Sequence, residues 1–158
     1  MEPTQADIRR HYESFPFPSG GTLHLTQHWT RLIQDFFQEK KIIPAGQTFL
    51  DAGCGTGDNL LNFAEEFPKL IFTGIDASAH SIRIAQGKQQ KLKSKNVGFS
   101  NEMILEHRTD QPYDFISCLG VLHHCQDPEK NLKHLLKMLN PGGYLLLDVY
   151  GYYGYLLT

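Results

Sequence analysis

The stretch Phe49-Leu50-Asp51-Ala52-Gly53-Cys54-Gly55-Thr56-Gly57-Asp58 decides the fold of this chain. Residues 48–50 are apolar and predict a buried strand, and three glycines at alternate positions follow the acidic residue that ends it. Four apolar residues then recur at the spacing of one helix face: Leu60, Phe63, Ala64 and Phe67. At such a turn a ligand can lie directly on the backbone, and the helix N-terminus behind it offers N–H groups and a positive dipole end. The stretch therefore predicts a ligand cradle on an α/β sheet.

The rest of the chain repeats the alternation of strand and helix. Further strands are expected at residues 70–75, 97–100, 113–119 and 144–149. Ser78 is expected to cap the helix after the second strand, and Asp127 with Pro128 to open the helix after the fourth. That helix is expected to bury Leu132, Leu135, Leu136 and Leu139. Five such repeats indicate a parallel sheet with helices on both faces.

Chemically informative residues fall at the predicted carboxyl ends of these strands. Asp51 and the glycines follow the first strand, Asp76 the second, Asn101 the third and Gly120 the fourth. In open parallel sheets, ligands bind outside the carboxyl ends of the strands. The sequence therefore predicts one ligand site at this edge of the sheet.

Residues 1–47 are expected to form a helical extension in front of a ligand-binding domain at residues 48–158. Thr4 should cap a first helix with Asp7 as its partner, and Thr26 a second helix. The prolines that follow Phe15 should end the first helix and form an aromatic elbow, which we interpret as a strap or lid. The apolar stripe of the second helix, which includes Trp29, is interpreted as core.

Composition and charge exclude several classes of protein. The 158 residues suit one domain, and 41% hydrophobic with 20% charged residues argues against disorder. A net charge of −2 provides no basic field to attract nucleic acid. Three cysteines without paired spacing argue against a disulfide framework, the N-terminus lacks a secretory signal, and the apolar runs are too short to span a bilayer. We therefore expect a cytoplasmic protein.

Two ligand classes fit a glycine turn followed by an acid at the next strand end. A dinucleotide fingerprint requires a small residue at its sixth position, where this chain has Asp58. A negative side chain there is a poor neighbour for a pyrophosphate, and Asp51 before the turn adds a second negative charge. The pattern favours a ligand without phosphates and with a positive centre.

Four motifs, in order, resemble those of class I S-adenosylmethionine-dependent methyltransferases: residues 50–57, 74–78, 113–124 and 139–143. The similarity runs from about Phe49 to Val149, and residues 12–18 resemble a leader found in some bacterial members. The resemblance implies a three-layer α/β/α Rossmann-like sandwich with a parallel sheet of about five strands in the order 3-2-1-4-5, preceded by two extra helices. It implies S-adenosylmethionine as cofactor, S-adenosylhomocysteine as product and methyl transfer by in-line displacement to an unidentified acceptor, most simply a small molecule.

The resemblance also implies a set of cofactor contacts. Asp76 would accept hydrogen bonds from the ribose hydroxyls, and Asp51 would help to hold the positive amino group. Asn101 or Glu102 would stand in for the acid that contacts the adenine amino group, because the usual Asp is absent here. The complete set of expected cofactor-binding residues is Asp51, Gly53, Cys54, Gly55, Thr56, Gly57, Asp76, Ala77, Asn101, Glu102, Leu119 and Gly120.

Catalytic residues are weakly indicated. His123 or His124 could act as a general base, since a histidine titrates near neutral pH, and Tyr12 could close over the cofactor. A structural or cofactor-pocket role for these histidines is the favoured interpretation. A metal site is disfavoured because the cysteines lack metal-ligand spacing relative to this pair.

The family's full domain adds two strands after the fifth, as an antiparallel hairpin, and residues 150–158 are too short for them. We therefore expect strand 5 at an open edge, which invites a second copy or another partner, and favour the front part of a longer enzyme. Two other functions stay open. One is a module that binds S-adenosylmethionine without turnover, and the other, less favoured, is an NAD-dependent oxidoreductase.

Overall fold

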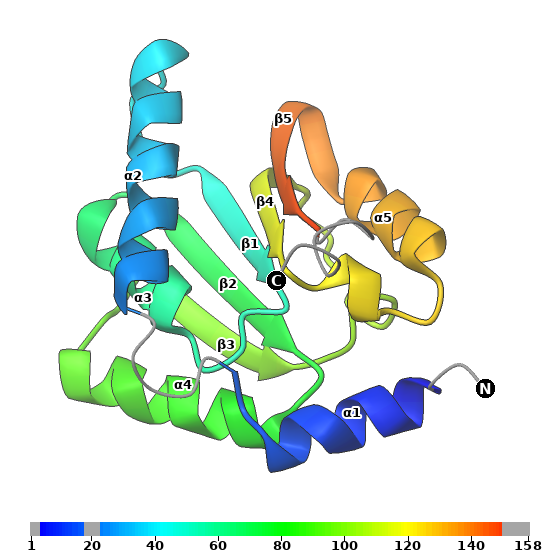
Figure 1. The fold of residues 1–158 in the computed structure, drawn as a ribbon. Helices are drawn as coiled ribbons and strands as arrows, with labels where there is room; N and C mark the ends of the chain where they lie inside the picture. The colour runs from blue at the N-terminus through cyan, green and yellow to red at the C-terminus, as the bar shows by residue number, and fades with distance from the viewer. Residues whose placement is uncertain (1–3, 18–22, 150–158) are drawn as a thin grey trace, which may run out of the picture.

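A computed structural model describes residues 4–17 and 23–149 (Figure 1). The elements in chain order are α1 (Gln5–Ser14), α2 (Leu23–Glu39), β1 (Thr48–Ala52), α3 (Asp58–Glu66), β2 (Ile71–Asp76), α4 (Ala79–Leu92), β3 (Val97–Asn101), β4 (Tyr113–Leu119), the 3₁₀ turn η1 (Leu122–His124), α5 (Pro128–Lys137) and β5 (Leu139–Asp148). The predictions about residues 150–158 and about Pro18 lie outside the described residues. None of the helices in the described ranges is long and apolar enough to cross a membrane.

The strands form one parallel sheet in the order β3-β2-β1-β4-β5, which confirms the predicted topology. β4 has the predicted bounds, whereas β5 starts at Leu139 rather than at Tyr144. The register between β4 and β5 shifts between Tyr113 and Phe115, where residues 140–143 make the strand irregular. Within the described residues β5 pairs with β4 alone, so the open edge is present. Its pairing with another chain stays a prediction.

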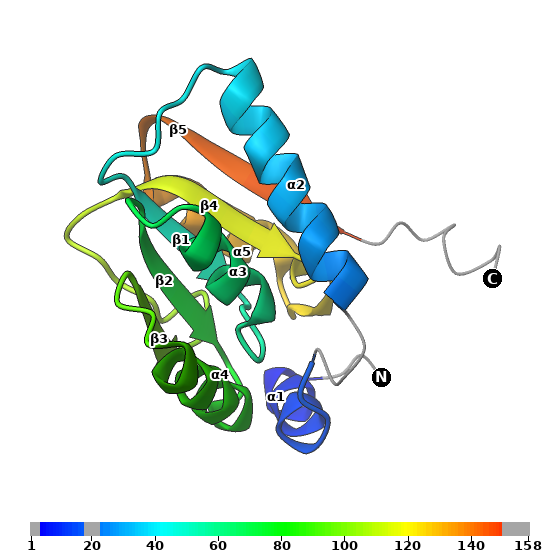
Figure 2. The ribbon, with the colours of Figure 1, turned by 90° about the vertical axis from the view of Figure 1, so that its left-hand side faces the viewer.

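Helices cover both faces of the sheet, as predicted. Figures 1 and 2 show α2 and α3 on one face and α5 on the other. The first core cluster joins Ile33 and Phe37 of α2 and Phe63 of α3 to the sheet, and the second packs Leu135 of α5 against Ile116 of β4. Burial of these apolar side chains is the main force that holds the layers together.

Three predicted helix caps are present. The Thr4 and Asp7 side chains accept hydrogen bonds from each other's backbone N–H groups, which makes a capping box at the start of α1. Ser78 Oγ accepts a hydrogen bond from the N–H of Ser81 at 3.1 Å, and Asp127 Oδ1 accepts one from Lys130 at 2.9 Å. Local side-chain chemistry thus sets these helix starts.

Two local predictions were wrong. The second helix begins at Leu23, so Thr26 lies inside α2 and does not cap it. The predicted buried stripe of α5 is too long, because Leu136 is 50% exposed and Leu139 belongs to β5. The helix ends two residues earlier than the leucine pattern suggested, and Met138, its C-terminal cap, is buried instead.

Helix α1 lies at the edge of the sheet toward which the β2 and β3 arrows point (Figure 1). The Glu13 carboxylate accepts hydrogen bonds from the N–H groups of Ala79 at 2.7 Å and His80 at 3.3 Å. Ser78 Oγ also donates to the Tyr12 carbonyl at 3.3 Å. A carboxylate at a helix N-terminus is electrostatically favourable, so these contacts fasten α1 to α4 across the carboxyl ends of the strands.

Candidate functional site

A cavity of about 380 Å³ lies at the carboxyl ends of the strands, between the sheet and α1. The ends of β2, β4 and β5 and the glycine turn after β1 form its floor. Eight of the predicted site residues line it: Gly53, Cys54, Gly55, Asp76, Ala77, Glu102, Leu119 and Gly120. The structure thus brings together residues from four loops that are distant in sequence.

The glycine turn presents few N–H groups to this cavity, because its amides are used inside the protein. Gly53 and Cys54 donate to the Ile75 carbonyl, Gly55 to Asp76 Oδ2, Thr56 to the Phe17 carbonyl and Gly57 to the Cys54 carbonyl, all at 2.8–3.0 Å. Phosphate cradles depend on N–H groups that are free to bind the anion. The amides of residues 53–57 therefore already have partners within the protein.

Glycine is required at two positions of the turn. Gly53 has φ +89°, and a Cβ there would clash with the Val121 side chain, whose Cγ1 would lie at 2.8 Å. Gly57 has φ +80°, and a Cβ there would lie 2.8 Å from the Ala85 Cβ. Both positions combine a left-handed backbone with a close neighbour. A side chain at either position would therefore be unfavourable for two reasons, the backbone conformation and the lack of space.

Asp76 ends β2 at the cavity wall. Its Oδ2 accepts the N–H of Gly55 at 2.9 Å, and its Oδ1 accepts the N–H of Ser78 at 2.8 Å. Burial raises the pKa of Asp76, while these two hydrogen bonds oppose the rise. A carboxylate offers about four lone-pair sites, so about two remain for ligand hydroxyl groups.

Asp51 lies below the turn and does not line the cavity. It is 3% exposed, and its Oδ1 accepts a hydrogen bond from Ser117 Oγ at 2.7 Å. Burial raises the pKa of Asp51 to about 6; the Ser117 hydrogen bond opposes the rise and the charge of Asp76 adds to it. A buried carboxylate in this position makes the environment of the turn favourable for a cation.

Asp58 is neutralised by a neighbouring helix. Lys88 Nζ of α4 lies 2.7 Å from both Asp58 carboxylate oxygens and also donates to the Thr56 carbonyl at 3.2 Å. Thr56 itself is buried and donates through its hydroxyl to Asp58. The negative charge of Asp58 is thus no argument against a bound phosphate. The argument against a phosphate is instead that the amides of the turn already have partners within the protein.

Asn59 completes the wall beside the turn. Its side-chain Oδ1 is buried and accepts no hydrogen bond from the described residues, and Asn59 lines the cavity. A buried acceptor without a donor costs about 1–3 kcal/mol. Such an atom is accounted for if a bound ligand supplies the donor.

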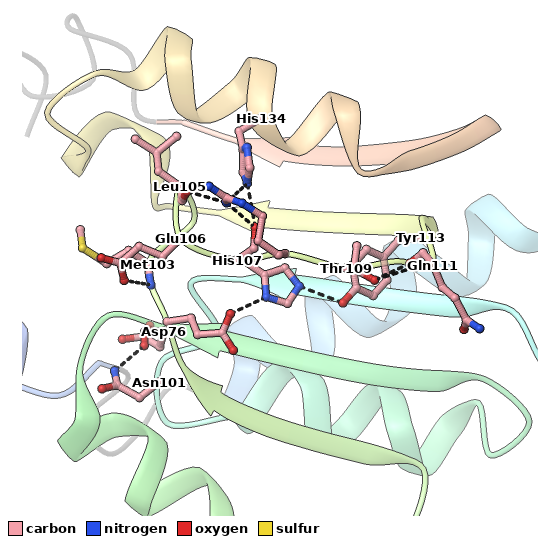
Figure 3. A network of polar contacts seen from close by, with 12 residues as sticks. Asp76, Asn101, Met103, Leu105, Glu106, His107, Thr109, Gln111, Tyr113 and His134 are labelled. Atoms are coloured by element: carbon pink, nitrogen blue, oxygen red, sulfur yellow. Dashed lines mark hydrogen bonds and ion pairs between the residues drawn. The ribbon is translucent and has the colours of Figure 1, made fainter.

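A polar network holds the loop after β3 (Figure 3). His107 Nδ1 is 2.7 Å from Glu102 Oε2, and His107 Nε2 is 3.0 Å from the Tyr113 hydroxyl. Burial raises the pKa of the Glu102 carboxyl, but hydrogen bonds from His107 and Ser100 outweigh this effect and hold the pKa below its usual value. Glu102 therefore faces the cavity as an oriented carboxylate.

Asn101 acts from outside the cavity. Its Nδ2 donates to the Asp76 carbonyl at 2.8 Å, and its Oδ1 accepts a hydrogen bond from Arg9 at 3.4 Å. Arg9, by contrast, lines the cavity. Asn101 thus links α1 to the end of β2, and Glu102 supplies the side chain that faces the ligand.

The two histidines after β4 differ in position. His124 lines the cavity and His123 does not, although their rings touch with centroids 4.0 Å apart. Burial lowers the pKa of both, with the charge of Asp148 opposing this for His123. A lowered pKa favours the neutral ring, which can accept a proton. Tyr12 lies against His124 with ring centroids 5.8 Å apart and also lines the cavity.

Sequence reasoning did not identify several residues of the wall: Arg9, Phe17, Asn59, Ser81, Met103, Ile104, Val121, Asn131 and Asp148. Trp29 was expected in the core; it packs on the first core cluster and lines the cavity as well. Asp148 carried a usable signal, since it ends a strand as Asp76 does. Cys125 is half-buried and also lines the cavity, while Cys118 is fully buried.

Comparison with known proteins agrees with this geometry. The methyltransferase domain family matches residues 22–156. (S)-Coclaurine N-methyltransferase of Papaver somniferum is 30% identical over 114 residues, 72% of this chain and 32% of that protein. tRNA U34 carboxymethyltransferase of Campylobacter curvus (strain 525.92) is 39% identical over 109 residues, 65% of this chain and 34% of that protein.

Among solved structures, PKMT2 from Rickettsia typhi in complex with AdoHcy superimposes with a TM-score of 0.61 and 33% identity. The match covers 66% of this chain and 21% of that one. The chain spans between 24% and 54% of the length of the most similar curated relatives.

Proposed function

The chain belongs to the methyltransferase domain family, and from this premise we propose that it binds S-adenosylmethionine and transfers its methyl group to an acceptor. The observation that carries the proposal is the kind of group that the cavity offers. Its wall presents the carboxylates of Asp76, Glu102 and Asp148 and the unsatisfied Asn59 oxygen, while the amides of residues 53–57 are occupied. A ligand rich in donors and with positive centres suits this wall; a pyrophosphate does not.

The cofactor contacts follow the order of the strands. Glu102 after β3 would accept from the adenine amino group, and Asp76 at the end of β2 would accept from the two ribose hydroxyls. The turn after β1, with Asn59 beside it and Asp51 below it, would hold the amino-acid portion and its ammonium group. Because α1 supplies Arg9 to this wall, the extension at residues 1–47 would act as part of the site.

The cofactor would supply a methyl group already activated on a positive sulfur. The task of the protein is then to bind both partners in line and to exclude water, and well-oriented reactants can gain about 7–11 kcal/mol in this way. Tyr12 and Phe17 from the N-terminal segment would cover the cavity, and the hydrogen bond from Thr56 to the Phe17 carbonyl fixes that cover. His124, in its neutral form, could accept a proton from the acceptor.

Two narrower proposals accompany this function. The acceptor would be a small molecule, because a cavity of about 380 Å³ under the N-terminal helix suits a small ligand better than a macromolecular strand. The protein would work in the reducing cytoplasm, because Cys54, Cys118 and Cys125 are free thiols.

Calorimetric titration with S-adenosylmethionine, S-adenosylhomocysteine and NAD tests the proposal. We expect binding of the first two and none of NAD, and the Asp76→Asn variant should bind about 10- to 100-fold more weakly, as loss of a hydrogen-bonded charge costs about 1–3 kcal/mol. Asp110→Asn, an exposed carboxylate outside the cavity, is the matched control. NAD binding alone would favour the oxidoreductase. Cofactor binding without methyl transfer to any compound of a broad acceptor panel would favour the module without turnover.

A further inference from the structure

Residues at both edge strands line the cavity: Glu102 comes directly after β3, and Asp148 ends β5. Neighbouring strands of the sheet lie about 4.8 Å apart. Four spacings place these two ends about 19 Å apart. If the proposed function holds, the cofactor occupies the region from β3 to β1 and reaches Leu119 and Gly120 after β4, and the space toward β5 is left for the methyl acceptor.

The β5 end of the cavity contains the carboxylate of Asp148. The backbone carbonyl of Asp148 accepts the N–H of Gly120 at 3.0 Å, and the charge of its side chain raises the pKa of His123 against the effect of burial. No described residue donates a hydrogen bond to the Asp148 side chain. By contrast, Asp76 is held by two backbone N–H groups and Glu102 by His107.

Aromatic side chains from α1 and α2 line the same cavity. Phe36 of α2 packs on Tyr144 of β5 with ring centroids 4.9 Å apart. Trp29 precedes Phe36 by two helical turns, about 10.5 Å, and Asp148 follows Tyr144 by four strand residues, about 13 Å. Trp29 and Asp148 both line the cavity. The contact between Tyr12 and His124 adds two further rings to the same wall.

The charges of the cavity are separated along its length. Arg9 is the cation among the described lining residues, and it bonds Asn101 at the β3 edge, across the sheet from Asp148. The β5 end therefore holds a carboxylate that accepts no hydrogen bond from the described residues, in a cavity that also presents aromatic faces. This combination attracts cations, through direct charge attraction and through cation–π contacts of about 0.5–2 kcal/mol each.

We propose that the β4–β5 end of the cavity binds a small, positively charged amine, and that this amine is the methyl acceptor. Asp148 pairs with the ammonium group, and Trp29 and Tyr12 pack on its carbon atoms. An ammonium proton passes to Asp148 or to His124, which frees the nitrogen lone pair. The lone pair then forms the new N–CH₃ bond while the bond from methyl to sulfur breaks, and its electron pair stays on the sulfur, which becomes neutral.

Three probes with the same ring and different charge test this proposal: benzylamine, benzyl alcohol and benzoate. Their binding is measured by NMR titration of the full chain, with and without saturating S-adenosylhomocysteine. We expect benzylamine to bind at least about tenfold more tightly than benzyl alcohol, which is about 1.4 kcal/mol, and benzoate to bind most weakly. The Asp148→Asn variant should lose the preference for benzylamine, whereas the exposed Asp110→Asn control should keep it.

Equal affinity for benzylamine and benzyl alcohol, or a preference that survives Asp148→Asn, would overturn the proposal. Binding of S-adenosylhomocysteine by the variant reports that it is folded. The two proposals fail separately: absence of S-adenosylhomocysteine binding refutes the cofactor, while the charge preference of the probes, measured without it, still decides the chemistry of the β5 end.

Discussion

Replacement of Asp51 by Asn should stabilise the ligand-free protein at neutral pH. Asp51 is 3% exposed, so its charged form has lost most of its hydration, and burial raises its pKa to about 6. Its one hydrogen bond comes from Ser117 Oγ at 2.7 Å. Asn keeps the shape and the acceptor oxygen for that bond, and it removes the charge.

The size and sign of the effect follow from the pKa. Above pH 6 the carboxyl must ionise inside the folded protein, where this is harder than in the unfolded chain. A rise from 3.8 to about 6 corresponds, at about 1.4 kcal/mol per pH unit, to about 3 kcal/mol of lost stability at pH 7.5. Because the folded pKa is raised, the favourable contribution is complete below about pH 4 and disappears as the pH rises through about 6. Asn cannot ionise, so the variant escapes this loss.

Urea unfolding of both proteins without ligand, at pH 4 and pH 7.5, measures the difference. We expect the midpoint of Asp51→Asn to exceed that of the parent by about 1.5 M at pH 7.5, for a denaturant slope of about 2 kcal/mol/M. At pH 4 the two midpoints should nearly coincide. Because each value is a difference between the variant and the parent at one pH, the contributions of all other groups that titrate between these pH values cancel.

A midpoint difference that is the same at both pH values would refute the reasoning, as would destabilisation by Asn at pH 7.5. Asp110→Asn, on the surface, should change the free energy of unfolding by less than about 0.5 kcal/mol at either pH. The stabilised Asp51→Asn protein should bind S-adenosylmethionine more weakly, because it lacks the charge that favours a cation at the glycine turn.

Three other substitutions test the packing and docking of the site. Gly53→Ala places an alanine in a left-handed conformation against its neighbours, so it should lower the free energy of unfolding by about 1–3 kcal/mol and weaken cofactor binding. Gly98→Ala, which has open space around its Cβ, is the control and should be nearly neutral in urea unfolding. Glu13→Gln removes the charge at the start of α4, so limited proteolysis should cut α1 faster, and unchanged cleavage would count against the docking role. Tyr113→Phe removes the partner of His107 Nε2 and should cost about 1–3 kcal/mol in thermal or urea unfolding; a neutral result would show that this hydrogen bond is not formed.

Much of the fold was predictable from local rules. The alternation of strand and helix and the caps at Thr4, Ser78 and Asp127 were predicted from such rules and confirmed. The strand order, which the family resemblance implied, was confirmed as well. The edge of the sheet that holds the site was predictable too, because parallel strands bring their carboxyl ends together. Thr26 was misassigned because a cap residue also fits inside a helix, where tertiary packing decides the start.

The sequence by itself thus determined the architecture, the glycine turn and the acids that end the strands, since these depend on neighbours a few residues apart. Only the tertiary structure decided which groups remain available for a ligand. The turn amides are used by Ile75, Asp76 and Phe17, and Lys88 neutralises Asp58, while no described residue donates a hydrogen bond to the Asp148 carboxylate. Each of these outcomes depends on a partner that lies far away in the chain, and hydrogen bonds and ion pairs form only when folding brings such partners within about 3 Å.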